Sequence, residues 1–114
     1  MPVTPRRGDL FVMDLGYSQG SEQRGPRPVL VVSDNLLNRS SPVVIVAPLT
    51  GAAPKRHYPH DVSVPPGTVS PRPGRVLCGQ IRTVSKQRLG RRLGVLPDRL
   101  MNQVDEALRL VLDL

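Results

Sequence analysis

The sequence predicts a mainly β fold, a small barrel of short strands followed by one C-terminal helix. Six short apolar runs, each about the length of a β-strand, are separated by glycine and proline residues that favour turns. Aromatic residues make up only 3% of the chain, so valine, leucine and isoleucine must fill the core. Such β-branched side chains suit a small, tightly curved sheet. Only one segment has the apolar spacing of an α-helix.

Strands are expected wherever an apolar run lies between turn residues. Three runs rich in Val, Ile or Leu are the strongest candidates, and three shorter runs are weaker ones. In chain order, the six runs are residues 9–15, 27–33, 43–49, 61–64, 75–78 and 80–84. Short helical turns are expected at 35–40 and 85–89. Prolines and glycines fill the gaps between these segments, and no linker is long enough to divide the chain.

The C-terminal helix is predicted from an apolar stripe that repeats every three or four residues. The stripe consists of Leu100, Val104, Ala107, Leu108 and Val111. Pro97 suits the first turn of a helix, and Asp98 places a negative charge at the positive end of the helix dipole. The helix is therefore expected to begin near Pro97.

The chain is short and strongly basic. Its 114 residues are expected to form a single domain, 1–114, because a second core would have too few residues. The formal charge is +7. Residues 1–97 contain fourteen Lys or Arg and five acids, whereas residues 98–114 contain two basic and four acidic residues. A basic body predicts an anionic partner, and nucleic acid fits better than a membrane surface because no basic amphipathic helix is found.

The cysteine content and the N-terminal residues indicate a cytoplasmic protein. Cys78 is the only cysteine, so there is no disulfide framework, and its apolar neighbours favour a buried structural thiol over a nucleophile. The N-terminus lacks the apolar stretch of a signal peptide, and no run of about eighteen apolar residues is available to cross a membrane. No set of His, Cys or acidic residues has metal-ligand spacing, so neither a metal nor another cofactor is expected.

Chemistry-bearing residues gather in the loop 20–28 and at the end of the third strand. Arg27 opens an apolar run between two prolines that fix its backbone, which is a poor place for a free surface charge and a good one for a fixed charge. A solvated hairpin connection is the simpler interpretation of the loop. Thr50 follows the third apolar run, and residues 80–88 alternate polar with apolar side chains, which also fits an edge strand protected by charge.

Four ordered motifs together resemble the MazF/PemK family of toxins from bacterial toxin–antitoxin pairs. The motifs are Arg7-Gly-Asp9, Gly20-Ser-Glu-Gln23 with Arg27-Pro28, Ala47-Pro-Leu-Thr50, and Gln80-Ile-Arg-Thr83 with residues 86–89. The resemblance covers about residues 7–112 with almost no gaps. It implies an SH3-like barrel of CcdB/Kid/MazF type with short helical turns and a C-terminal α-helix. It further implies a homodimeric endoribonuclease (an mRNA interferase) that cleaves single-stranded mRNA independently of metal and ribosome and has an acidic, MazE-like antitoxin.

The resemblance also implies roles for individual residues. Arg27 and Thr50 fall on the family's catalytic arginine and threonine, and Glu22 falls on an acid with a share in proton transfer. Gln80 and Arg82 fall on the strand that helps line the RNA groove. The other residues expected to bind RNA are Tyr17, Ser21, Gln23, Arg24 and Lys86. Gly79 departs from the family, whose members often carry an acid there. The departure bears on any base contact by that side chain, and so on the RNA motif that is cut, but not on the reaction.

Elementary chemistry supports such a reaction without settling every role. RNA supplies its own nucleophile, the 2′-hydroxyl, so the protein need only align it, shuttle protons and stabilise the crowded phosphorane. A mechanism using His57 and His60 is a rival, although two histidines three apart on a loop rarely face one phosphate. Tyr17 fits either base stacking or a half-buried loop position.

Two other classes of function remain open at this point. One is a nucleic-acid-binding barrel without catalytic activity, which would share the basic body but would not depend on Thr50. The other is a toxin directed at DNA gyrase. Toxins of that related branch rely on a C-terminal tryptophan, and this chain contains no tryptophan.

Overall fold

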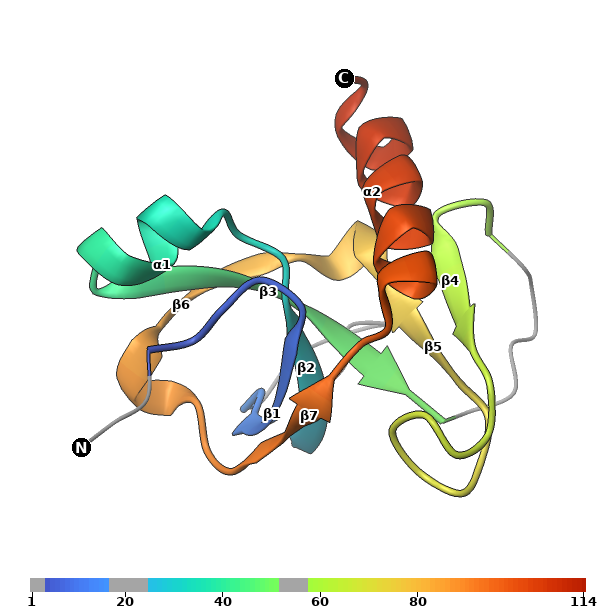
Figure 1. The fold of residues 1–114 in the computed structure, drawn as a ribbon, viewed down its shortest axis with the longest axis horizontal. Coiled ribbons are helices and arrows are strands. Elements are labelled where there is room, and N and C mark those ends of the chain that lie inside the picture. Colours follow the sequence, from blue (N-terminus) through green and yellow to red (C-terminus); the bar gives the residue numbers. More distant parts are fainter. Residues whose placement is uncertain (1–3, 17–24, 52–57) are drawn as a thin grey trace.

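The computed structural model describes residues 4–16, 25–51 and 58–114. Within these residues the chain forms a curled antiparallel half-barrel, mainly β, with a long helix at its C-terminal end (Figure 1). Single turns of 3-10 helix are labelled η. In chain order, the elements are β1 (Asp9–Asp14), β2 (Pro26–Val31), α1 (Asn35–Ser40), β3 (Val43–Thr50), β4 (Asp61–Val64), β5 (Gly74–Leu77), η1 (Cys78–Gln80), β6 (Arg82–Ser85), η2 (Lys86–Arg88), β7 (Arg92–Val95) and α2 (Asp98–Leu112).

The long strand β3 organises the sheet, because it pairs with three other strands. β2 runs along one edge of β3. On the other edge, the first half of β3 pairs with β6, where Val46 lies opposite Arg82, and its end pairs with β5, where Leu49 lies opposite Val76. The path through the sheet is β4-β5-β3-β2-β1-β7, with β6 off that path. The C-terminal end of β3 is therefore held between β2 and β5.

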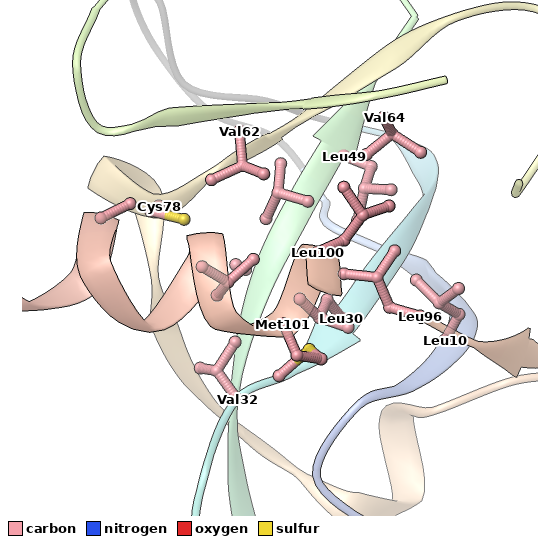
Figure 2. Close-up of a cluster of buried hydrophobic side chains, with 14 residues drawn as sticks. Leu10, Leu30, Val32, Leu49, Val62, Val64, Cys78, Leu96, Leu100 and Met101 are labelled. Carbon is pink, nitrogen blue, oxygen red and sulfur yellow. The ribbon is translucent and has the colours of Figure 1, made fainter. Parts of the chain in front are cut away.

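Two hydrophobic clusters lie on the two faces of the central strands. Successive side chains of a strand point to opposite faces, so Val29 and Val31 of β2 enter one cluster while Leu30 and Val32 enter the other. Figure 2 shows the cluster beneath α2, in which Leu100 of the helix lies near leucine and valine side chains from the strands. Burial on both faces explains why these runs are continuously apolar instead of alternating with polar residues.

Helix α2 packs one face on the sheet and leaves the other in solvent. Its buried residues are Leu100, Met101, Val104 and Ala107. An ion pair between Arg7 and Asp105 ties the exposed side of the helix to the segment before β1, and Arg7 also donates a hydrogen bond of 3.1 Å to the carbonyl oxygen of Val32. In the described parts of the chain, no helix is long and apolar enough to span a membrane.

The predicted mainly β fold with a C-terminal helix is confirmed, and most element bounds lie within two residues of expectation. Both α1 and β4 have the predicted bounds. Helix α1 begins where the side chain of Asp34 accepts a hydrogen bond of 2.9 Å from the backbone N–H of Leu36, a normal N-cap. Helix α2 begins at Asp98, with Pro97 at its N-cap position.

Two sequence-based expectations about the strands need correction. The strand predicted at 80–84 begins later, because residues 78–80 form the turn η1 and β6 runs from Arg82 to Ser85. The strand β7 is not predicted at all, since its four residues include an exposed Arg92 and a Gly94 with a φ of 151°. It forms by pairing with β1, and an ion pair of 3.2 Å between Arg92 and Asp9 supports that pairing.

Candidate active site

Arg27 and Thr50 line the same small pocket, which has a volume of about 80 Å³. Its walls are the ends of β2 and β3 and the loop that joins β4 to β5. Besides Arg27 and Thr50, the described residues with polar side chains that line the pocket are Ser70 and Arg72. The structure thus brings together two of the three residues that the sequence predicts to be catalytic.

The register of β2 and β3 explains why Arg27 and Thr50 meet. The two strands are antiparallel, and Val29 lies opposite Pro48. Continuing this register by two residues places Arg27 opposite Thr50, and directly opposed residues direct their side chains to the same face of the sheet. This continued register therefore places Arg27 and Thr50 on the same face of two neighbouring strands.

Arg27 is exposed and lies near the start of β2, between Pro26 and Pro28. Proline fixes its own backbone φ angle and donates no backbone hydrogen bond. This end of the strand is therefore stiff although it lacks some of the backbone hydrogen bonds to its neighbours. Four other arginines form ion pairs with acids in the structure. Within the described residues Arg27 has no such acid partner.

Thr50 is buried, with 6% of its surface exposed, at the last position of β3. It pairs with Arg75 of β5. Gly74 next to it approaches so closely that a Cβ there would lie 2.9 Å from the carbonyl oxygen of Thr50. A glycine is needed at this point because any side chain would push β5 away from β3. The backbone of Thr50 is therefore held in place between β2 and β5.

The loop before Arg27 contains most of the remaining predicted residues, and these lie outside the described residues. They are Tyr17, Ser21, Glu22, Gln23 and Arg24. The base of the loop is described: Leu15 donates a hydrogen bond of 2.8 Å to the carbonyl oxygen of Gly25, and Gly25 donates one of 3.1 Å to that of Gly16. The loop that carries Glu22 thus rejoins the sheet two residues before Arg27.

Three residues predicted to bind RNA lie outside the Arg27–Thr50 pocket. Gln80 belongs to η1, not to a strand, and lines a second cavity of about 330 Å³. Arg82 donates a hydrogen bond of 3.2 Å to the carbonyl oxygen of Leu15. Lys86 lines a third cavity of about 470 Å³. Their contacts with RNA stay a prediction, and any RNA that reached all three would have to extend well beyond the pocket.

His60 lies in the second cavity and does not line the pocket of Arg27 and Thr50. Its ring stacks on Tyr58, with ring centroids 5.2 Å apart, and a Cβ on Gly79 would lie 2.9 Å from that ring. The missing side chain at Gly79 thus leaves room for His60. The other member of the rival histidine pair, His57, lies outside the described residues.

Cys78 is fully buried, as the sequence predicts, and is not part of the pocket. Burial, and then the negative charge of Asp61, raise the pKa of its thiol to about 12. The thiol is therefore protonated at neutral pH and does not act as a nucleophile. Among the described residues, no three His, Cys, Asp or Glu side chains form a group that could hold a metal ion.

Sequence reasoning did not identify Ser70 and Arg72, which also line the pocket. The sequence does contain a signal for Arg72, because Pro71-Arg72-Pro73 repeats the local pattern of Pro26-Arg27-Pro28. The same physical reason that favoured a fixed charge at Arg27 applies there as well.

A family model described as "PemK-like, MazF-like toxin of type II toxin-antitoxin system" matches residues 6–112. The chain belongs to the MazF/PemK family. One curated relative in this family, Endoribonuclease EndoA of Bacillus subtilis (strain 168), is 42% identical over 110 residues, which cover 96% of this chain and 95% of EndoA. The resemblance inferred from the four motifs is therefore confirmed over nearly the whole chain.

Solved structures of an endoribonuclease and of a MazF protein have the same fold. A mycobacterial endoribonuclease in complex with its cognate antitoxin is 34% identical, with a TM-score of 0.80, and 96% of each chain is covered. MazF from Deinococcus radiodurans is 28% identical, with a TM-score of 0.83, over 99% of this chain and all of that one. The curled half-barrel with a C-terminal helix is thus the MazF fold.

Proposed function

We propose that this MazF/PemK chain is the toxin of a type II toxin–antitoxin pair and cleaves single-stranded mRNA at selected sequences. Cleavage proceeds without a metal ion or the ribosome and leaves a 2′,3′-cyclic phosphate and a 5′-hydroxyl. The observation that carries the proposal is the Arg27–Thr50 pocket, which is lined by a buried threonine and by an arginine that has no acid partner among the described residues. The 42% identity with an endoribonuclease supports RNA as the substrate.

The proposed reaction uses the nucleophile that RNA itself provides. The 2′-oxygen attacks the adjacent phosphorus and forms a new P–O bond, while the bond from phosphorus to the 5′-oxygen breaks. A base removes the proton of the 2′-hydroxyl, and the departing 5′-oxygen gains a proton. The protein's task is to hold the phosphate and to stabilise the charge that develops on its two non-bridging oxygens.

Arg27 and Thr50 fit the second of these tasks. The planar guanidinium of Arg27 can donate two parallel hydrogen bonds to the non-bridging oxygens, and the Thr50 hydroxyl can donate one more. Arginine keeps its proton in proteins, so electrostatic stabilisation is its first role. Glu22, in the loop that rejoins the sheet just before Arg27, is proposed as the base that accepts the 2′ proton.

The partners follow from the charge and from the relatives. A chain of net charge +7 attracts both RNA and an acidic protein. Two family structures contain an antitoxin, one mycobacterial and one from Deinococcus radiodurans. We therefore propose an acidic, MazE-like antitoxin that competes with RNA for the basic surface around the pocket, and a homodimer as the active form.

The chemistry of the products tests this function. Purified protein should cut a single-stranded RNA in excess EDTA, and the fragments should carry 2′,3′-cyclic phosphate and 5′-hydroxyl ends because the nucleophile is internal. Mass spectrometry of the fragments identifies both ends. A substrate with a 2′-deoxy residue at the cut site is the control and should stay intact. Fragments with 5′-phosphate ends would refute the mechanism, and binding without any cleavage would favour the non-catalytic nucleic-acid-binding barrel.

A further inference from the structure

Arg72 shares the pocket of Arg27 and Thr50, and nothing in the proposed reaction uses it. Arg72 belongs to the loop that joins β4 to β5, and its side chain is exposed. The residues that line the pocket include these two arginines and no acid. Both arginines stand between prolines, and in the described residues neither has an acid partner. Among the described residues, the pocket thus presents two positive charges and no acid that neutralises them.

The loop that carries Arg72 is built to hold its shape. Gly67 donates a hydrogen bond of 2.7 Å to the carbonyl oxygen of Ser70. The Ser70 hydroxyl accepts a hydrogen bond of 3.2 Å from the backbone N–H of Arg72. The same hydroxyl donates a hydrogen bond of 3.2 Å to the carbonyl oxygen of Arg72. Two residues later, Gly74 packs against the carbonyl oxygen of Thr50. The backbone of Arg72 is therefore fixed relative to Thr50 before any ligand binds, which lowers the entropic cost of binding.

Two like charges that face one small cavity repel each other in the free protein. An anion between or beside them removes this repulsion. An RNA backbone supplies such anions at regular intervals. The two arginines also come from different elements, because Arg27 belongs to β2, on one side of β3, while Arg72 belongs to the loop that leads into β5, on the other side.

From these observations we infer that Arg72 binds an RNA phosphate next to the one that is cleaved. Arg27 stabilises the reacting phosphate, and Arg72 fixes the position of the strand by holding the neighbouring phosphate. The inference rests on the proposed function. It assigns the loop between β4 and β5 a part in placing the substrate. Arg72 is therefore a residue that binds substrate rather than one that stabilises the transition state.

Replacing Arg72 should weaken RNA binding far more than it slows the reaction of bound RNA. For Arg72→Ala we expect the Kd of an uncleavable 2′-deoxy substrate to rise on the order of 10-fold, the size typical of a charge-assisted hydrogen bond. The slope of log Kd against log salt should fall by about 0.7, the value for one phosphate contact on a single strand. Arg72→Lys should keep most of the slope, because a point charge still neutralises a phosphate.

The deciding experiment pairs the Arg72 variant with single uncharged phosphates. Each phosphate of the 2′-deoxy substrate is replaced in turn by a neutral methylphosphonate, and Kd is measured by fluorescence anisotropy for the wild type and for Arg72→Ala. At one position flanking the cut site, the methylphosphonate should weaken RNA binding by the wild type. The same replacement should leave the affinity of Arg72→Ala for RNA unchanged. Arg39→Ala is the matched control, since Arg39 is an exposed arginine on α1, away from the pocket, and its replacement should leave the slope unchanged.

Two results would overturn the inference, and a third would overturn the proposed function instead. If each methylphosphonate lowered the RNA affinity of the wild type and of Arg72→Ala equally, Arg72 would contact no phosphate. If the methylphosphonate at the cleaved position lowered the affinity of the wild type but not of Arg72→Ala, Arg72 would have the role assigned to Arg27. Both results leave RNA cleavage by the wild type intact. Absence of RNA binding and cleavage by the wild type would instead refute the proposed function.

Discussion

At the scale of single residues, Arg27 and Thr50 differ in charge and in burial, so their replacement should have different consequences. Arg27 is exposed, and its side chain adds little to the core. Thr50 is buried at the end of β3 beside β5, so its methyl group contributes to stability, while its hydroxyl is the group proposed to act on the phosphate. A valine at position 50 keeps the shape and removes only the hydroxyl.

Arg27→Ala should reduce single-turnover cleavage by at least ~100-fold with saturating enzyme, the loss typical when one fixed oxyanion donor is removed. Arg27→Lys should recover little, because an ammonium group cannot donate two parallel hydrogen bonds. Thr50→Val should slow cleavage by less than Arg27→Ala, because a neutral donor stabilises a developing charge less than a guanidinium does. Cleavage of an end-labelled RNA, followed in rapid-quench experiments, measures all three rate constants.

The matched control for this prediction is His60→Ala, which removes the rival general base. His60 stacks on Tyr58 in a different cavity, so the saturating rate constant should stay near that of the wild type. Far-UV circular dichroism should be the same for all variants. Normal cleavage by Arg27→Ala, or a loss confined to the histidine variant, would show that the active site lies elsewhere and that the pocket has another purpose.

At the scale of elements, helix α2 contributes to the site only through stability. Its buried face covers the hydrophobic cluster that contains Leu30 of β2. No residue of the helix lines the Arg27–Thr50 pocket. Leu100→Ala should therefore lower the free energy of unfolding by about 2–5 kcal/mol, the cost of deleting a buried leucine side chain and leaving a cavity. Urea unfolding followed by circular dichroism measures this change.

Leu112→Ala is the control for the helix, since Leu112 has the same side chain on the same helix but is 50% exposed. Its effect should stay within about 0.5 kcal/mol. Below the unfolding transition, Leu100→Ala should still cut RNA at a rate close to that of the wild type. Equal destabilisation by the two variants would mean that the packing described for α2 is not what stabilises the sheet.

At the scale of the whole molecule, the protein is small relative to an RNA strand. Its principal extents are 40 × 30 × 29 Å, and the pocket of about 80 Å³ is far too small to enclose several nucleotides. Because the family is also expected to be dimeric, we predict a homodimer whose RNA groove crosses or borders the interface. Light scattering at micromolar concentration should give about twice the chain mass of 12.5 kDa. A fully active species with the mass of one chain would contradict the dimer.

Features that depend on local pattern can be predicted from the sequence alone. The β-strands that are buried on both faces appear as continuous apolar runs, and α2 appears as an apolar stripe with helical spacing, because burial leaves a direct mark on residue type. Pro26 and Pro28 mark Arg27 as a fixed charge in the same local way. Four motifs in order were enough to indicate the family, which the match over residues 6–112 confirms.

Which of these residues meet depends on how the strands pair and pack. Arg27 and Thr50 come together because β2 and β3 pair in one register, and a shift of a single residue would have turned one side chain to the other face. Arg72 joins them because Gly74 lets β5 approach the backbone of Thr50, a contact between segments far apart in the chain. β7 escapes prediction for the same reason, since its half-exposed residues become a strand only by pairing with β1. Local sequence records the burial of a residue, whereas strand register and the approach of distant segments depend on the packing of the whole chain.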